Sequence, residues 1–334
     1  MSTMNKIYTP WDIGMGEERT IRDLLRFGVL APSSHNSQPW IFHVDNETIS
    51  VSIETGRRLP ASDPNDRQST ISIGCAIANI EIAADYYGYT CVVEESQEKP
   101  LIAKLRFSRK NSQHLNKVSH LANYISKRTT NRAPHQDRVL DEDVLKSIRD
   151  LGSESLRIDI VTERTRIREL GTVAIEAGID AFEDKNFRYE LSRYLKPNNT
   201  KSYVGMPGFG FGFPTFLSFV APVLMRFFNM EKPARKQNKV LFNNTAAILV
   251  LSTPADRVHD WVSVGRVYEH IALLATRSDM ASSPWAAVIQ IGEHYRKVQE
   301  ILGITGRPQM LFRLGYPISQ ISHSPRLPVE SVTS

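Results

Sequence analysis

The sequence has few cysteines and no apolar core near its beginning. Its two cysteines, Cys75 and Cys91, lie among apolar residues, so a disulfide framework is excluded and buried free thiols are expected. The opening stretch, MSTMNKIYTPWDIG, lacks the apolar core of a secretory signal. From this we expect a cytoplasmic protein.

The signatures of several chemistries are also missing. The histidines show no paired spacing of metal ligands, so we predict no metal site. Ser33 and Ser34 stand beside His35, but no G-x-S-x-G elbow accompanies them, and neighbours in sequence rarely face each other as nucleophile and base. A dinucleotide-binding fingerprint is absent as well.

The charge balance is only mildly basic. Lysine and arginine number 41 against 36 acidic residues, which gives a formal net charge of +5, and the two signs are mixed along the chain. Nucleic-acid binding usually requires a basic stripe with interleaved aromatics, so we expect no nucleic acid partner. A length of 334 residues with 41% hydrophobic residues suits one large domain or two closely packed ones.

One long apolar segment covers residues 205–228, GMPGFGFGFPTFLSFVAPVLMRFF. It has about the length of a membrane span, but glycines and the prolines at Pro207, Pro214 and Pro222 interrupt it. We therefore expect a lid or an interfacial helix and not a transmembrane one. Membrane contact is the less favoured interpretation, because apolar lids are usually buried against their own protein.

Apolar periodicity predicts helices and strands in both parts of the chain. The first part is expected to form a helix over 17–30, a hairpin of strands over 40–44 and 48–53, a buried helix over 69–87 closed by Gly88, and strands over 90–95 and 101–107. The second part is expected to form helices over 115–127, 141–151, 165–183, 261–280 and 294–302, strands over 156–162, 245–252 and 310–315, and a loop over 282–285.

The predicted fold class is α+β with two similar halves, because each part has a long, mostly buried helix followed by a polar connection and further strands. We place the halves at 1–114 and 115–334, with an apolar lid insertion over about 188–228. The seam between the halves is the natural place for a ligand.

Three stretches carry the residue types of an anion-binding site. Residues 31–40, APSSHNSQPW, crowd hydroxyl and amide groups between two prolines that restrict the backbone. In residues 128–132, RTTNR, the two arginines share one side whether the segment is extended or helical, and guanidiniums bind phosphate bidentately. Residues 324–328, SPRLP, hold an arginine between two prolines, so it loses little freedom on binding an anion.

Each stretch also has a plain structural interpretation. The first fits a Ser/Asn turn between a helix and a strand, the second a solvated basic turn before a helix, and the third a frayed terminus. Taken singly, none of the three decides the function.

Taken together, the stretches resemble the nitroreductase family. APSSHNSQPW followed by a strand is similar to that family's flavin-contacting loop, RTTNR to its N-terminal Arg-x-Ser/Thr-x-Arg/Lys segment, and SPRLP to its C-terminal phosphate-binding arginine. The helix over 261–280, SSPW and PQMLFRLGYP resemble its last helix, flavin-facing loop and final strand. The motifs stand in the family's order over nearly the whole chain, which implies a nitroreductase-like fold.

The distribution of the motifs resembles an internally fused, Acg-like subgroup of that family. Ordinary members are homodimers in which each subunit carries every motif, whereas here the serine-rich loop lies only in the first half and the other motifs only in the second. The resemblance therefore implies a monomer that acts as an intramolecular pseudo-dimer with one flavin site. It leaves further association of chains open.

The resemblance also implies a role for each motif residue. Arg128, Thr130 and Arg132 would hold the phosphate, ribityl chain and pyrimidine edge of FMN, and Arg326 with Ser324 would close on the phosphate. The serine-rich loop would reach the ring and the phosphate end across the seam, and backbone groups of the later loop would face the flavin N5. The residues are Pro32, Ser33, Ser34, Asn36 and Gln38 in the first loop, Ser282, Ser283 and Pro284 in the later one, and Lys236 or Lys239 as a further candidate near the ring.

No side chain is assigned a catalytic role, because the flavin itself carries the redox chemistry. The implied function is an FMN-dependent oxidoreductase that passes electrons from NADPH or NADH to a nitroaromatic, a quinone or a similar small molecule. The alternative is a protein that stores or sequesters FMN beneath its lid with little turnover. A third interpretation is membrane-surface association through residues 209–228, with Phe211, Phe213, Phe216 and Phe219 exposed to lipid.

The expected phosphate contact of Arg128 leads to a quantitative expectation. Arg128→Ala should weaken FMN binding by about 1.5–3 kcal/mol, the range for a hydrogen bond to a charged group, without loss of the fold.

Overall fold

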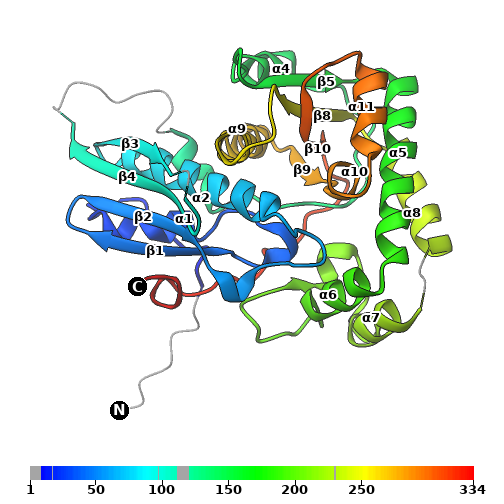
Figure 1. Cartoon of the computed structure of the whole chain (residues 1–334), viewed down its shortest axis with the longest axis horizontal. Coiled ribbons are helices and arrows are strands. Elements are labelled where there is room, and N and C mark those ends of the chain that lie inside the picture. Colours follow the sequence, from blue (N-terminus) through cyan, green and yellow to red (C-terminus); the bar gives the residue numbers. More distant parts are fainter. Residues whose placement is uncertain (1–8, 17, 97, 111–119, 229–230) are drawn as a thin grey trace.

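The computed structural model describes residues 9–16, 18–96, 98–110, 120–228 and 231–334 (Figure 1). In these ranges the chain forms two four-stranded antiparallel sheets, each packed against a long helix. The predicted α+β class is confirmed.

The first sheet has the strand order β1-β2-β4-β3. β1 (Trp40–Asp45) and β2 (Thr48–Ile53) form the expected hairpin, which turns at Asn46 with a φ of 49°, because asparagine tolerates left-handed backbone. Burial alternates along β2, as in a sheet with one face on the core. The sheet is completed by β4 (Leu101–Arg109) beside β2 and β3 (Tyr89–Glu95) at the edge.

The second sheet has the order β5-β8-β10-β9. Its central strands, β8 (Ala247–Thr253) and β10 (Arg307–Gly315), are buried along nearly their whole length, while β5 (Arg157–Val161) and β9 (Ala281–Pro284) form the edges. The long helix α5 (Arg164–Glu183) packs on the outer face. Burial on both faces explains why β8 is continuously apolar and does not alternate.

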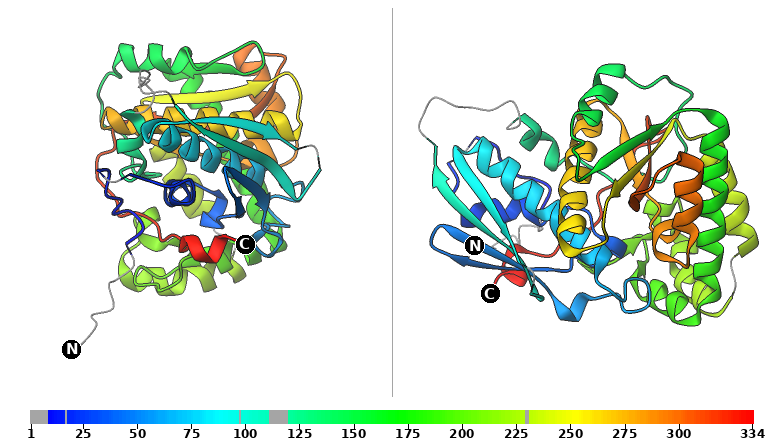
Figure 2. Two further views of the ribbon diagram at one scale, coloured as in Figure 1. Left: turned by 90° about the vertical axis from the view of Figure 1, so that its left-hand side faces the viewer. Right: turned by 45° about the horizontal axis from the view of Figure 1, so that its top comes forward.

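The two central helices, α2 (Arg67–Tyr86) and α9 (Val258–Arg277), pack against each other between the sheets (Figure 2). They approach most closely at Gly74 and Gly265. A Cβ on Gly265 would overlap the carbonyl oxygen of Ile71 and lie 2.9 Å from the Cα of Gly74. One continuous apolar core therefore joins both sheets through this helix pair.

The remaining elements are short or peripheral. Before the central helix lie η1 (Arg22–Leu24), α1 (Leu25–Gly28), η2 (Ser34–Asn36) and η3 (Thr55–Arg57). After the first sheet follow α3 (Ala122–Ile125), α4 (Glu142–Arg149), α6 (Lys185–Tyr194), β6 (Leu195–Lys196), β7 (Met206–Pro207), η5 (Gly208–Phe211), α7 (Thr215–Phe227), α8 (Glu231–Asn243), α10 (Ala287–Gln290), α11 (His294–Leu302) and η6 (Val329–Val332).

Most expected elements are confirmed, and three differ. Of the helix expected over 17–30, the described residues form only η1 and α1, and residue 17 lies outside them. The Thr20 and Asp23 side chains bond each other's backbone N–H groups and start the helix there. Of the helix expected over 115–127, only α3 is formed within the described residues, and 115–119 lie outside them. The loop expected at SSPW is the edge strand β9, because it pairs with β10.

The apolar segment folds outside both sheets, as η5 and α7. α7 stays helical although Pro222 lies inside it. Ser218 and Ala221 are buried, whereas Phe216 and Phe219 are 74% and 51% exposed. Among the described residues, no helix has both the length and the apolar character needed to cross a bilayer. The expectation that the segment is buried against its own protein therefore holds for only one side of α7.

The C-terminal segment crosses from the second sheet to the first (Figure 1). Thr333 forms a parallel bridge with Phe42 of β1, and the Ser334 N–H donates to the Phe42 carbonyl oxygen at 2.9 Å. Arg326, which precedes this contact, is only 3% exposed. The plain interpretation of this segment as a frayed terminus is thus wrong.

Candidate functional site

The serine-rich loop, residues 31–40, has a strained backbone. His35, Asn36 and Gln38 have φ angles of 52°, 52° and 53°, in the left-handed region that costs non-glycine residues about 1 kcal/mol or more. The Ser33 hydroxyl helps to hold this shape by accepting the Gln38 N–H at 3.0 Å. Such strain persists only where the surroundings impose it, so the loop is a candidate site.

Two arginines from distant parts of the chain meet behind this loop. Arg128 Nη2 donates to the carbonyl oxygen of Leu30 at 3.1 Å, and Arg326 Nη2 donates to the same oxygen at 3.3 Å. Arg326 Nη1 also donates to Oδ1 of Asn36 at 2.8 Å. The three stretches singled out from the sequence therefore lie together.

Arg326 joins the tail to the loop. Its guanidinium donates to the carbonyl oxygens of Ala31, Ser324 and Pro325 in addition to the contacts above. Several of its N–H groups thus already meet protein oxygens. Arg326 has a structural role beside the phosphate contact expected of it, and that contact stays a prediction.

Arg128 faces a buried carboxylate. Its Nε lies 3.2 Å from Oε1 of Glu269 on α9, and the two side chains are 2% and 0% exposed. Burial raises the pKa of Glu269 to about 7, although Arg128 opposes that rise. Burial, aided by Glu269, also raises the pKa of the nearby Cys75 thiol. The guanidinium is fixed by Glu269, by the Leu30 carbonyl oxygen and by the Thr130 hydroxyl, which accepts from Arg128 Nη1 at 3.4 Å. The remaining N–H groups on its Nη atoms are left for a ligand.

β9 lies beside the RTTNR segment. Thr130 and Ser282 form a parallel bridge, and the Asn131 N–H donates to the Ser282 carbonyl oxygen at 3.2 Å. The hydroxyls of Ser282 and Tyr268 are 2.9 Å apart. The Ser283 hydroxyl is buried, and within the described residues it has no hydrogen-bond partner. An unpartnered buried hydroxyl at this position fits a bound polar group.

Arg132 has no carboxylate opposite it in the part of the chain that the structure describes. Its guanidinium carbon is 4.6 Å from the centroid of the Phe211 ring, and its Nη2 is 4.0 Å from Sδ of Met206. Burial lowers the pKa of Arg132. Burial and the Arg132 charge together lower the pKa of His35 to about 4. A half-buried cation of this kind suits an anionic ligand, or a ring that becomes anionic on reduction.

Residues 203–213 lie against the serine-rich loop. Gln38 Nε2 donates to the Tyr203 carbonyl oxygen at 2.7 Å. Asn36 and Gly205 exchange two hydrogen bonds, of 2.9 Å from the Asn36 side chain and 3.3 Å from the Gly205 N–H. With the Phe211 ring over Arg132, this is the position that a lid over the site would take.

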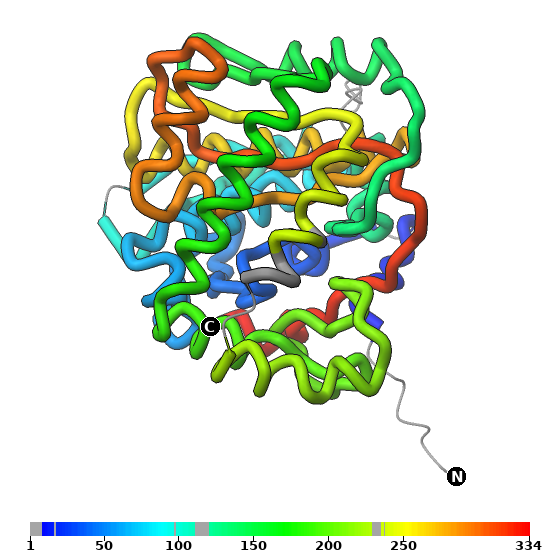
Figure 3. Tube along the Cα trace, turned by 90° about the vertical axis from the view of Figure 1, so that its right-hand side faces the viewer, coloured from blue at the N-terminus to red at the C-terminus, as the bar shows by residue number. Residues whose placement is uncertain are grey.

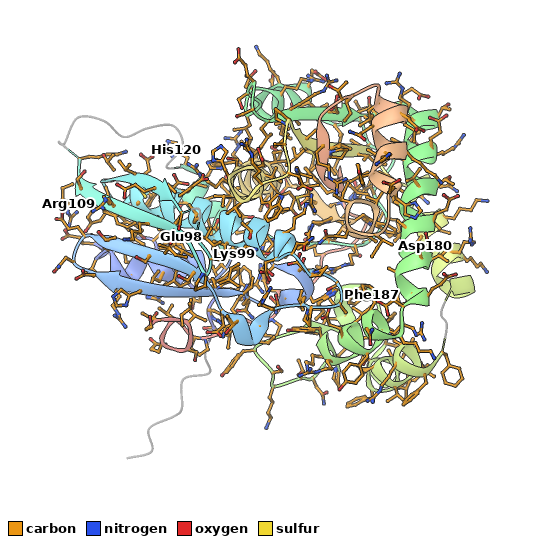
Figure 4. All side chains as sticks on the ribbon, viewed as in Figure 1. Glu98, Lys99, Arg109, His120, Asp180 and Phe187 are labelled. Carbon is orange, nitrogen blue, oxygen red and sulfur yellow. The ribbon has the colours of Figure 1, made fainter. Side chains whose placement is uncertain are left out.

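α6 supplies residues that the sequence reasoning missed. The His35 ring centroid lies 6.5 Å from that of Phe187, labelled in Figure 4, and 5.8 Å from that of Tyr194. Glu190 of the same helix accepts from the N–H of Ser62 at 3.0 Å and from its hydroxyl at 2.5 Å. The only signal in the sequence was a pair of aromatic residues seven apart, which places them on one side of a helix.

Glu269 is a second residue that was missed. It stands among apolar residues in the helix expected over 261–280, and a charged side chain in a buried helix requires a partner. That rule reveals the need for a cation, but the sequence does not say which one.

The other candidates occupy varied positions. The Ser34 N–H and hydroxyl lie 3.4 and 3.5 Å from acceptors on Ser72 and Gln68 of α2. Pro32 and Pro284 are half-buried, and Ser324 contributes its carbonyl oxygen, which also accepts from Trp11 Nε1. Lys236 and Lys239 are exposed on α8.

Two cavities lie among other residues. One, of about 280 Å³, is lined by Arg266, His270 and the segment before β5. The other, of about 190 Å³, is lined by residues around His135 and Thr245. Within the described ranges, no group of three His, Cys, Asp or Glu side chains is placed to hold a metal ion.

No protein-family model matches the chain. Curated proteins of Mycobacterium tuberculosis are nevertheless similar to it over most of its length. One, named an uncharacterized protein, is 26% identical, covering 90% of this chain and 89% of that protein. Another, named a putative NAD(P)H nitroreductase, is 24% identical, covering 90% and 86%. A third, named putative NAD(P)H nitroreductase acg, is 23% identical, covering 93% and 94%.

These relatives confirm the resemblance to the nitroreductase family, and the third agrees with the Acg-like subgroup. Together with the two-sheet architecture they confirm the predicted nitroreductase-like fold. The division into two fused halves is not tested by them and stays a prediction.

Solved structures show weaker likeness. An FMN-dependent nitroreductase, NfnB from Mycobacterium smegmatis in complex with NADPH, is 16% identical, covering 65% of this chain and 99% of that one, with a TM-score of 0.43. A putative nitroreductase from Anabaena variabilis is 12% identical, covering 81% and 69%, with a TM-score of 0.47.

Proposed function

We propose that this chain is an oxidoreductase that binds FMN between the serine-rich loop, the RTTNR segment and β9. It takes reducing equivalents from NADPH or NADH and passes them to a small conjugated acceptor such as a nitroaromatic or a quinone. The observation that carries the proposal is the meeting of Arg128 and Arg326 at the Leu30 carbonyl. Relatives named putative NAD(P)H nitroreductases support it.

The residues present fit such a cofactor. Arg128 and Arg326 give the phosphate end two buried cations, and Arg132 gives the ring edge a cation without a carboxylate partner among the described residues. The unpartnered Ser283 hydroxyl adds a polar group from β9. Bound FMN would supply the redox chemistry, while these side chains bind and orient it.

The two sheets support the proposed division into halves, 1–114 and 115–334. Each sheet has four antiparallel strands and one central helix of 20 residues. The proposed FMN site draws its loop from the first half and its arginines from the second. One chain thus supplies both sides of the seam, as a pseudo-dimer requires.

The proposal is tested by titrating the purified protein with FMN and adding NADPH or NADH without oxygen. We expect FMN to bind and its absorption to bleach with at least one of the two reductants. A protein that binds no FMN would refute the cofactor site. A bound flavin that neither nicotinamide reduces would refute the oxidoreductase.

The same FMN titration with the Arg132→Ala variant tests the role proposed for Arg132. We expect FMN to bind about 10- to 100-fold more weakly, because the variant loses a hydrogen bond to a charged group, while the fold persists. Arg138→Ala is the matched control, since the Arg138 guanidinium also lies over a ring, that of Tyr316, at 3.8 Å. Equal FMN affinities for the two variants would contradict the placement of the ring edge.

Storage of FMN with little turnover is the second candidate function, and the contacts of residues 203–213 with the serine-rich loop and with Arg132 favour it. If this segment shuts substrates out, Phe211→Ala should raise the rate of flavin reduction several-fold without changing FMN affinity by more than about twofold. Phe216→Ala, on the exposed side of α7, is the control. An unchanged reduction rate in Phe211→Ala would count against occlusion.

A further inference from the structure

The outward side of α7 carries a stripe of large apolar side chains. Of the twelve such side chains that are exposed among the described residues, six lie between 216 and 228. Five of them belong to α7, and their spacing of three, one, three and four places them on one side of the helix. The apolar stripe consists of Phe216, Phe219, Val220, Val223, Phe227 and the adjoining Phe228, which are 46–74% exposed.

An exposed stripe of this kind requires an occupant. Large contiguous apolar patches on soluble monomers usually serve for binding. α7 presents its apolar stripe on the side opposite Ser218 and Ala221, which are buried against the rest of the protein. The proposed lid does not use the outward side of α7, because its contacts with the serine-rich loop come from Tyr203 and Gly205 and its contact with Arg132 comes from Phe211.

The same region is strongly basic. Residues 191–244 contain eight lysines and arginines and a single acidic residue, Glu231, a formal charge of +7 in a chain whose total is +5. The rest of the chain is therefore slightly acidic. The basic residues are Arg193, Lys196, Lys201, Arg226, Lys232, Arg235, Lys236 and Lys239, and of these Arg193, Lys201, Arg226, Arg235, Lys236 and Lys239 are exposed.

α7 and the basic helix α8 follow each other in the chain and lie at the same end of the molecule (Figures 1 and 3). An amphipathic surface with aromatic side chains and flanking cations is typical of elements that lie in the interface of an anionic membrane. A second copy of the chain is disfavoured as the occupant, because two regions of this charge would repel each other.

We propose that α7 and α8 bind the surface of an anionic lipid bilayer, with the apolar stripe of α7 inserted at the level of the headgroups. Exposed cations of the two helices, Arg226 on α7 and Lys236 and Lys239 on α8, then face lipid phosphates. The binding is peripheral, since no helix of the described chain spans a bilayer. It goes beyond the proposed function and does not depend on it.

Sedimentation with lipid vesicles tests this proposal on the full chain. We expect the protein to sediment with vesicles that contain one third phosphatidylglycerol and to remain in the supernatant with pure phosphatidylcholine. Raising the salt concentration should weaken the binding, because surface charges are screened. A protein that stays in the supernatant with the anionic vesicles at low salt would overturn the proposal.

Two double variants separate the apolar and the charged contributions. The double variant Lys236→Glu with Lys239→Glu should lose at least tenfold in vesicle binding, since one cation near an anionic leaflet contributes about fivefold. The double variant Phe216→Ser with Phe227→Ser should also lose at least tenfold, because binding strength scales with the apolar area buried in the interface. The matched controls, Val139→Ser with Ile318→Ser and Lys146→Glu with Arg277→Glu, change exposed residues elsewhere and should bind as the unmodified chain does.

The substituted side chains are exposed, so circular dichroism should show an unchanged fold in all four variants. Vesicle binding that persists in both test variants would overturn the assignment to α7 and α8. Light scattering gives a further readout. A dimer that disappears in the phenylalanine variant, in a protein that binds no vesicles, would identify the stripe as a contact between copies and overturn the proposal.

Discussion

Gly265→Ala is expected to lose at least about 3 kcal/mol of the free energy of unfolding, and the variant should accumulate poorly as folded protein. A Cβ at this position would overlap the Ile71 carbonyl oxygen and press on the Cα of Gly74. Both obstacles are backbone atoms in the middle of a helix, so neither can move aside as a flexible side chain would. Urea denaturation followed by circular dichroism measures the loss.

Gly178→Ala is the matched control for this prediction. Gly178 also lies inside a long helix, α5, but nothing stands within 4 Å of a Cβ built there. Alanine should therefore stabilise the protein by about 0.5–1 kcal/mol through its better helix propensity. A Gly265→Ala variant that unfolds at the same urea concentration as the unmodified chain would show that the two central helices do not pack as described.

Arg128→Ala is expected to destabilise the protein strongly above neutral pH. Arg128 is the cation within ion-pair distance of Glu269 in the described structure, and removing one partner of a buried pair typically costs about 3–5 kcal/mol. The sequence alone led us to expect a loss of FMN affinity without loss of the fold. The buried pair changes that expectation.

The size of the effect should depend on pH through Glu269. Burial raises the pKa of Glu269 in the folded protein to about 7, far above its unfolded value, so the folded state holds a proton that the unfolded state has released. The contribution of this bound proton to the free energy of unfolding is present at low pH and is lost as pH rises through the pKa of Glu269 in the folded protein. Removing Arg128 raises this pKa further, because Arg128 favours the ionised form.

The free energies of unfolding of the unmodified chain and of Arg128→Ala should therefore differ least below neutral pH. At about pH 6 Glu269 is largely protonated in both, and Arg128→Ala should cost about 2 kcal/mol for the lost hydrogen bonds and packing. The gap should widen by up to about 1.4 kcal/mol per pH unit above pH 7, to about 4 kcal/mol near pH 8.5. Thermal or urea unfolding across this range measures it.

The carboxyl group of Glu269 has neighbours on several elements. Cys75 and Asn79 of α2 face Glu269, Arg128 pairs with it, and the tail brings Arg326 close. Arg128→Ala with Glu269→Gln removes the titrating carboxylate and should lose the pH dependence of the gap while recovering part of the stability. A gap that is constant from about pH 6 to 8.5 in the single variant would contradict the role given to the pair.

Several local features followed from the sequence. The hairpin of β1 and β2 and the buried helix closed at Gly88 were predictable, because short-range periodicity and backbone preferences set them. The strand pairing of Ser282–Pro284 was not predictable, because β9 exists through its bonds to a strand some thirty residues away.

The candidate site divides in the same way. Arg128, Arg326 and the serine-rich loop were recognisable because their three stretches together resemble the motifs of one family, whereas each stretch alone also fits a plain turn or terminus. The contact that Arg128 and Arg326 share at the Leu30 carbonyl oxygen, and the pairing of Arg128 with Glu269, were not recognisable from the sequence. Those partners lie far away in the chain, and no local pattern encodes them.

α7 shows most clearly the difference between what the sequence determines and what only the tertiary structure determines. The sequence by itself determined that residues 205–228 are apolar and interrupted by prolines, and that the residues around them are basic. A helix that is apolar on every side carries no signal of which side is buried. Only the tertiary structure decided that Ser218 and Ala221 face the protein while the apolar stripe faces outward, because burial depends on neighbours brought together from the whole chain.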